Sequence, residues 1–209
     1  MKTGLMLLTA LMLMMQLSAQ SFLPLKDVGE MQKKVAEASL KTNTIQCDFT
    51  QEKTMSMLTE KLLSKGRFYF ERNNKVRLEY TSPAPSTIVM NGGKLLVKDS
   101  KKTTLTDIHK NRAFQQLNNI IVGSINGNLF SSKDFNSKFY ESATQWKVEM
   151  VPGNKTMRNF ISTIVIVLEK KDCTATRIEM NEPGGDSTVL SFTSKELNKA
   201  LNSTVFSLQ

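Results

Sequence analysis

The sequence predicts an α+β protein built around an antiparallel sheet that curls or closes on itself. Hydrophobic and polar residues alternate over several short segments, and turn residues separate those segments. Two other segments, one near the N-terminus and one in mid-chain, show helical spacing instead. The 209 residues contain no internal repeat or low-complexity linker, so one α+β domain is the simplest organisation.

Residues 1–19 are expected to form a secretory signal peptide. Lys2 supplies a positive start, residues 5–17 form a nearly pure apolar run, and Ser18 and Ala19 are small residues before Gln20. The apolar run is short for a membrane span, and a retained N-terminal anchor helix is the alternative. Cleavage near Ala19 would leave residues 20–209 as a single exported domain.

An amphipathic helix is expected at the start of this domain, with Asp27 as its N-cap. Its apolar face would comprise Val28, Met31, Val35, Ala38 and Leu40. After residue 43 the spacing changes to period two. Alternation over 45–50, 67–72, 76–80 and 146–150 predicts strands with one apolar and one polar face. Turn residues at 73–74, 83–85, 91–93, 152–154 and 182–186 separate the strands.

Two segments depart from this alternation. Residues 113–125 place Phe114, Leu117, Ile121 and Val122 at helical spacing, which predicts a helix between the strands. Residues 161–168 (ISTIVIVL) are almost continuously apolar and should form the most deeply buried strand.

The chain offers little for catalysis, and no enzymatic activity, metal site or cofactor is expected. Its single histidine, His109, excludes a multi-histidine zinc site, and Ser124 lacks the glycine that a nucleophile elbow needs. No phosphate-binding glycine motif is present. In an oxidising compartment Cys47 and Cys173 are candidates for a disulfide, with two free thiols as the alternative.

The net charge of +9 suggests an anionic partner, but its distribution argues against a nucleic-acid surface. Basic residues are spread along the chain and mixed with acidic ones, without a long run of like charges or an aromatic–basic motif. We therefore favour a solvated, positively biased surface and expect no nucleic-acid partner. Attraction to anionic lipid head groups stays open.

Several predicted apolar strand faces carry bulky side chains, including Phe68, Phe70 and Trp146, and core packing is the simplest interpretation. Arg72 stands out because alternation places it on the same face as Phe68 and Phe70. A guanidinium there needs hydrogen-bond acceptors, unless Arg72 simply ends its strand and reaches solvent.

Three segments stand out in order along the chain: residues 49–53 (FTQEK), 66–72 (GRFYFER) and 76–83 (VRLEYTSP). Together they resemble the LolA family of periplasmic lipoprotein carriers. The following residues 88–92 (IVMNG), with Leu95 and Leu96, resemble the next hairpin of that family. The resemblance is clearest up to about residue 99 and weaker beyond it.

This resemblance implies a half-open, strongly curved antiparallel barrel of about eleven strands, with helices as a lid over an apolar cavity. The lid would be the first helix and residues 113–125. The cavity would be lined by Phe68, Phe70, Val76, Leu78, Tyr80, Ile88, Leu96, Trp146, Val148 and Met150. By the same resemblance, Arg72 would be the latch that hydrogen-bonds the lid closed.

The resemblance also implies a function and partners. The protein would be a periplasmic, monomeric carrier that shields the acyl chains of lipoproteins between an inner-membrane ABC-type exporter and an outer-membrane acceptor. The main alternative is a lipid-sensing regulatory protein, or a general lipid-binding envelope protein, on the same fold. A small hydrolase and a basic anion-binding module are weaker alternatives, because the residues for them are largely missing.

Overall fold

The computed structural model describes residues 21–209, so the signal peptide expected over residues 1–19 lies outside the described residues. The strands are Leu23–Pro24 (β1), Thr44–Thr54 (β2), Leu62–Glu71 (β3), Lys75–Ser82 (β4), Ser86–Asn91 (β5), Lys94–Asp99 (β6), Thr103–Asp107 (β7), Phe135–Glu141 (β8), Gln145–Pro152 (β9), Thr163–Glu169 (β10), Ala175–Asn181 (β11) and Ser187–Leu197 (β12). The helices are Val28–Lys41 (α1), Arg112–Asn126 (α2) and Lys155–Arg158 (α3), with 3-10 turns at Ile108–Lys110 (η1) and Asn128–Ser131 (η2).

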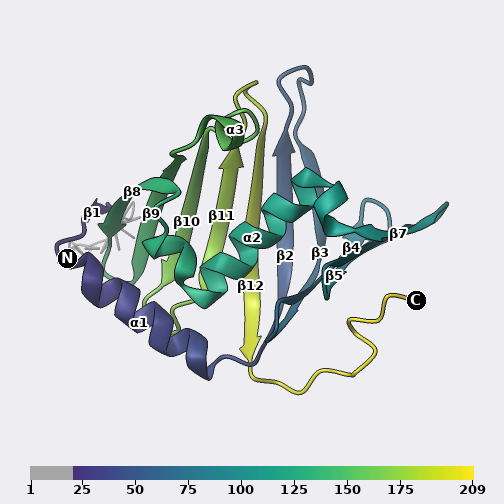
Figure 1. Cartoon of the computed structure of the whole chain (residues 1–209), viewed down its shortest axis with the longest axis horizontal. Helices are drawn as coiled ribbons and strands as arrows, with labels where there is room; N and C mark the ends of the chain where they lie inside the picture. Colours follow the sequence, from purple (N-terminus) through teal and green to yellow (C-terminus); the bar gives the residue numbers. More distant parts are fainter. Residues whose placement is uncertain (1–20) are drawn as a thin grey trace, which may run out of the picture.

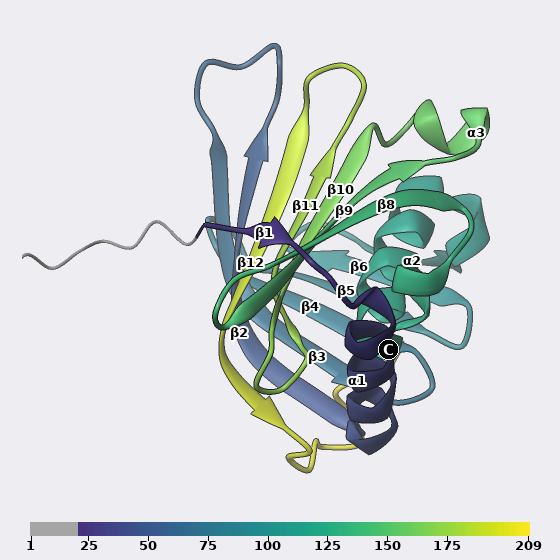
Figure 2. The same ribbon diagram turned by 90° about the vertical axis from the view of Figure 1, so that its left-hand side faces the viewer.

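All twelve strands belong to one antiparallel sheet, in the order β1-β8-β9-β10-β11-β12-β2-β3-β4-β5-β6-β7. The late strand β12 pairs with the early strand β2, and this pairing joins the two halves of the sheet. The sheet curves around α1 and α2, which lie on its concave side (Figures 1 and 2). Strands β1 and β7 are its two edges. The predicted half-open curved sheet with helices is therefore confirmed, with twelve strands where about eleven were expected.

Helix α1 forms where the sequence predicts it. The Asp27 side chain accepts a hydrogen bond from the backbone N–H of Glu30 at 2.8 Å, as an N-cap does. Met31 and Val35 are buried against the concave side, but Leu40 is 74% exposed. The prediction that Leu40 shares their apolar face was wrong, since five residues after Val35 the helix has turned about 140° from it.

Helix α2 covers the segment expected over residues 113–125. The Asn111 side chain accepts from the backbone N–H of Phe114, and Gly127 at φ 78° ends the helix in the left-handed conformation that suits glycine. Along the helix, Ile120, Ile121 and Val122 are buried and belong to the main core. No helix of residues 21–209 is long and apolar enough to span a membrane.

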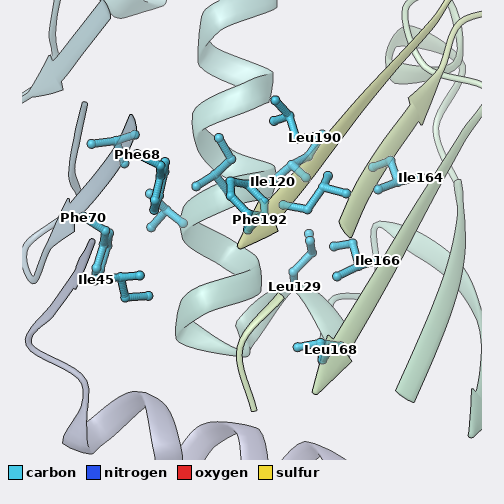
Figure 3. Packing of buried hydrophobic residues seen from close by; sticks show 14 of the residues in the cluster. Ile45, Phe68, Phe70, Ile120, Leu129, Ile164, Ile166, Leu168, Leu190 and Phe192 are labelled. Carbon is cyan, nitrogen blue, oxygen red and sulfur yellow. The ribbon is translucent and has the colours of Figure 1, made fainter. Parts of the chain in front are cut away.

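The core lies between the concave face and the helices. Side chains from the strands on both sides of β12 meet those of α2 and η2 there (Figure 3). Strand β10 contributes the predicted buried segment, with Ile164, Ile166 and Leu168 fully buried. A second, small apolar cluster lies on the opposite face, where Val89 and Leu96 pack against Phe206 of the C-terminal segment.

Candidate functional site

The concave interior brings together nine of the ten side chains that the sequence analysis assigned to a cavity. Eight are buried in the main core and Tyr80 packs against it as a partly buried neighbour. The eight are Phe68, Phe70, Val76, Leu78, Ile88, Trp146, Val148 and Met150. Antiparallel pairing explains their common side, since Phe68 lies opposite Leu78, and Leu78 opposite Ile88.

Leu96 does not belong to this interior. In the β5–β6 hairpin, Met90 pairs with Leu95 on the concave side, and Val89 pairs with Leu96 on the other face. The prediction of Leu96 as a cavity residue was wrong because residues 95–97 (LLV) are apolar at every position. Such a run does not show which of two neighbouring leucines faces inward.

The interior is almost filled in this conformation. Beneath the C-terminal half of α2 it holds a void of about 30 Å³, beside Phe68, Ile121 and Phe192. That volume is close to the share of liquid volume taken by one water molecule. A ligand larger than a water molecule can therefore enter this part of the interior only if α2 moves away from the sheet.

A larger groove, here called the α2 groove, lies beneath the first turns of α2 and measures about 360 Å³. Its floor is apolar and its rim carries polar groups from the sheet, including Gln51, Lys53 and Glu182. The apolar lining comprises Tyr80, Ile88, Ala113, Phe114, Leu117, Phe160, Ile161, Met180 and Leu190. A concave, mainly apolar site of this size with a few polar groups is typical of small-molecule binding.

A second pocket of about 340 Å³ lies next to the α2 groove, between α2, η2 and α3. Gln116 and Ile161 line both this pocket and the α2 groove. The two spaces therefore flank the same stretch of α2, and a displacement of that helix would join them to the interior.

Tyr80 forms the boundary between the α2 groove and the core. Its hydroxyl donates to Gln51 Oε1 at 2.8 Å, and its ring meets Phe49 edge-on at 5.1 Å. Burial raises the pKa of Tyr80 to about 12, so the phenol stays neutral. Gly66 makes this packing possible, because a Cβ there would lie 2.2 Å from the Glu79 carbonyl oxygen and 2.8 Å from the Phe49 ring.

Arg72 joins the sheet to the end of α1. It follows β3 directly, and its guanidinium Nη2 donates to the carbonyl oxygens of Ser39, Leu40 and Thr42, each at 2.9 Å. Its Nε donates to Asn43 Oδ1 at 3.0 Å. The last carbonyls of a helix lack partners within the helix, so the cation satisfies them and complements the helix dipole. We call these four hydrogen bonds the Arg72 clasp.

The Arg72 side chain thus does not lie among the apolar side chains of the interior. Alternation placed it on the face of Phe68 and Phe70, and the structure shows it at the strand end, reaching α1. A second contact supports the same helix end, since Asn198 donates to the Lys41 carbonyl at 3.0 Å and accepts from the backbone N–H of Asn43. Asn198 follows β12, so both strands that flank β2 contribute contacts at the end of α1.

Cys47 and Cys173 are both free thiols, so the alternative to the disulfide holds in this structure. Cys47 is buried beside the void under α2, whereas Cys173 is half-buried in the turn between β10 and β11. Burial raises the pKa of Cys47 to about 12, which keeps it a thiol.

Lys195 is a residue of the interior that the sequence analysis missed. It lines the same void, and its Nζ donates to Thr174 Oγ1 at 2.5 Å and lies 3.4 Å from an Asp172 carboxylate oxygen. An irregularity in β12 between Thr193 and Glu196 turns this lysine inward. Nothing in the sequence around residue 195 distinguishes such a bulge from regular alternation.

The thiol of Cys47 can report opening of the interior. In a Cys173→Ser variant at pH 8, we expect alkylation of Cys47 to be slower by about a hundredfold than that of an unfolded control, because the thiolate is the reactive form and is both buried and rare. The rate is measured by mass spectrometry after timed quenching. A Cys47 that reacts as fast as an unfolded thiol would show that α2 does not cover it.

In the structure, His109 and Ser124 hydrogen-bond to other residues and not to each other. His109 is exposed and its Nδ1 lies 2.8 Å from Gln115 Nε2, while the Ser124 hydroxyl donates to the Ile121 carbonyl of its own helix. In the same residues no three histidine, cysteine, aspartate or glutamate side chains come together in a group that could hold a metal ion.

A family model described as "Outer membrane lipoprotein carrier protein LolA" matches residues 40–209. No curated protein matches the chain in sequence. The matched region contains β2 to β12, α2, α3 and Arg72, and begins just before the end of α1.

Solved structures share the architecture at low identity. The MucA/MucB complex of Pseudomonas aeruginosa contains a chain with a TM-score of 0.52 and 14% identity, covering 87% of this chain and 60% of that one. An uncharacterized conserved protein from Thermus thermophilus has a TM-score of 0.52 and 10% identity, covering 84% and 89%. The LolA superfamily protein NE2245 from Nitrosomonas europaea has a TM-score of 0.44 and 11% identity, covering 85% and 96%. The chain thus spans about 60% of the MucB-complex chain, and the first two likenesses show a shared fold.

Proposed function

The chain belongs to the LolA family, and from that premise we propose that it carries acylated lipoproteins across the bacterial periplasm. The inner-membrane donor would be an ABC-type exporter, and the acceptor would lie at the outer membrane. The protein would act as a monomer, without catalysis or a cofactor. Its signal peptide would be removed near Ala19 during export.

The observation that carries this proposal is the combination of an apolar interior with a polar clasp that holds its cover. The α2 groove supplies an entrance of about 360 Å³ with an apolar floor. The nine assigned interior side chains would line the space that opens when α1 and α2 move. Arg72 would be the latch, because its clasp ties α1 to the sheet.

A carrier needs both strong shielding and release. Burying an acyl chain of about 16 carbons gains on the order of 12 kcal/mol, which alone would make release very slow. Opening the cover breaks the clasp and exposes core side chains, and this cost offsets part of the gain. The free energy of cargo binding is then the gain from burying the acyl chain minus the cost of opening the cover. A change in the Arg72 clasp alters that cost and therefore the affinity.

Binding of a synthetic lipopeptide tests this function. A fluorescent peptide carrying three acyl chains should bind the purified protein in detergent-free buffer, whereas the same peptide without acyl chains should not. Fluorescence anisotropy measures both. If both peptides bind equally well, or if neither binds, a function based on acyl shielding is contradicted.

Transfer separates a carrier from a lipid sensor on the same fold. A carrier should pass the bound lipopeptide to acceptor vesicles and become empty, whereas a sensor should keep its ligand. Retention of the lipopeptide in the presence of excess acceptor membrane would favour the sensing alternative.

A further inference from the structure

The β6–β7 edge of the sheet concentrates positive charge that looked scattered in the sequence. Residues 94–112 contain six basic residues, all exposed, against the two acidic residues Asp99 and Asp107. The six are Lys94, Lys98, Lys101, Lys102, Lys110 and Arg112. We call this set the basic edge.

The fold brings these residues to one side of the molecule. Strands β6 and β7 pair as a hairpin, with Lys98 opposite Thr103 and with Lys101 and Lys102 in its turn. Strand β7 is the last strand of the sheet, and η1 and the start of α2 follow it immediately (Figure 1). Lys110 and Arg112 therefore extend the basic edge from the hairpin to the first turn of α2.

Neighbouring carboxylates offset only part of the charge of the basic edge. Within residues 21–209, the ion pairs involve lysines and arginines elsewhere in the molecule and none of the six. The Asp99 carboxylate accepts from the backbone N–H groups of Lys101 and Lys102, and Asp107 accepts from that of His109. The six cations outnumber these two carboxylates, so the edge keeps a net positive charge and a positive field.

The basic edge also adjoins the entrance of the α2 groove. Arg112 lies 4.8 Å from the centroid of the Phe160 ring, and Phe160 lines that groove and is 41% exposed. Ala113 and Phe114, the next residues of α2, line the groove as well. Leu105 of β7 is also exposed, but it pairs with Leu96 and so lies on the opposite face of the sheet from the groove.

We propose that the basic edge docks the protein on an anionic lipid bilayer, with the entrance of the α2 groove turned toward the membrane. Five of the six cations are lysines at exposed positions. A lysine ammonium is a point charge, which suits a diffuse layer of lipid phosphates, whereas two-pronged binding of a carboxylate favours arginine. A bilayer also offers apolar surface to the exposed Phe160 ring beside Arg112, which a nucleic-acid backbone does not. The biological role of docking rests on the proposed carrier function, but the binding itself can be tested separately.

Vesicle co-sedimentation tests the proposal with two variants of equal net charge. The edge variant combines Lys98→Gln, Lys101→Gln, Lys102→Gln and Lys110→Gln. The control variant combines Lys133→Gln, Lys138→Gln, Lys155→Gln and Lys171→Gln, which are exposed lysines outside the basic edge. The vesicles contain phosphatidylcholine alone, or phosphatidylcholine with about one-third phosphatidylglycerol, in about 0.05 M salt.

The wild type and the control variant should bind the anionic vesicles, and the edge variant should bind about tenfold more weakly or worse. Raising the salt to about 0.5 M should abolish the difference, because exposed charges are then screened. Equal losses in both variants would show that net charge alone attracts the membrane, and binding to neutral vesicles at the same level would show that charge is not involved. Either result would overturn the proposal.

A third variant, with Leu62→Asn and Leu63→Asn, changes the exposed apolar side chains at the β2–β3 hairpin. It should bind anionic vesicles like the wild type, and loss of binding in this variant alone would place docking at the hairpin and contradict the proposal. Lipopeptide binding without vesicles, measured in all variants, should be unchanged. If the wild type fails to bind lipopeptide, the carrier function fails, whereas loss of vesicle binding alone overturns only the docking.

Discussion

Replacing Arg72 with leucine is expected to leave the fold intact, to tighten the binding of acylated cargo and to slow its release. The substitution removes four hydrogen bonds between the guanidinium and the end of α1. Bonds to a charged donor are worth roughly 1.5–3 kcal/mol each when buried, and because Arg72 is partly exposed we expect about 2 kcal/mol in total. The closed, empty state loses this stabilisation, while the open, cargo-bound state does not.

An energy difference of about 2 kcal/mol corresponds to about thirtyfold in the opening equilibrium. The apparent dissociation constant for the acylated peptide should fall by up to that factor, and most of the change should appear in the dissociation rate. In the Cys173→Ser background, the alkylation of Cys47 should accelerate by a similar factor. Stopped-flow fluorescence and timed alkylation measure the two effects independently.

Arg67→Leu is the matched control, because Arg67 lies on β3, which Arg72 directly follows, but is exposed and alternates with the inward-facing Phe68. This substitution should alter neither the dissociation rate of the lipopeptide nor the alkylation rate of Cys47. Arg72→Lys should give an intermediate result, since one ammonium group cannot reproduce the guanidinium contacts. Release from Arg72→Leu at the wild-type rate would show that the clasp does not hold the cover.

Introducing a charge into the α2 groove is expected to abolish cargo binding. Leu117 lines the groove and packs against the main core as a partly buried residue. In Leu117→Arg, an acyl chain would have to displace or desolvate a guanidinium. If only four methylene groups of the acyl chain are no longer buried, the binding free energy weakens by about 3 kcal/mol, which is more than a hundredfold in affinity.

The same lipopeptide assay measures this effect. Leu23→Arg is the control, because Leu23 is 65% exposed on the edge strand β1 and the charge change is identical. Circular dichroism checks that both variants are folded. If Leu117→Arg does not fold, the milder Leu117→Ala provides a second test. Undiminished binding by a folded Leu117→Arg would show that cargo does not enter through the α2 groove.

The sequence was most informative where alternation and turn chemistry agreed. The faces of β3, β4 and β9 followed directly from the alternation of Phe68, Leu78 and Val148 with polar neighbours. Helix α1 was recognisable from Asp27 and from the spacing of Met31 and Val35.

Other features depended on information that one residue and its neighbours do not carry. The inward face of β6 could not be assigned because both Leu95 and Leu96 are apolar, and only pairing with β5 decides between them. Lys195 turns inward through a backbone irregularity in β12. Likewise, the six cations of the basic edge are spread over 19 residues of sequence, and only the pairing of β6 with β7 brings them to one edge of the sheet.

Native mass spectrometry of the protein purified from the cell envelope without detergent tests the central claim most directly. We expect the wild type to carry a substoichiometric adduct whose mass and fragments identify an acylated protein, and Leu117→Arg to be free of it. An Arg72→Leu sample should carry more of the same adduct. A wild type that is always empty, or that holds lipid equally well in Leu117→Arg, would contradict an acyl-shielding interior beneath α1 and α2.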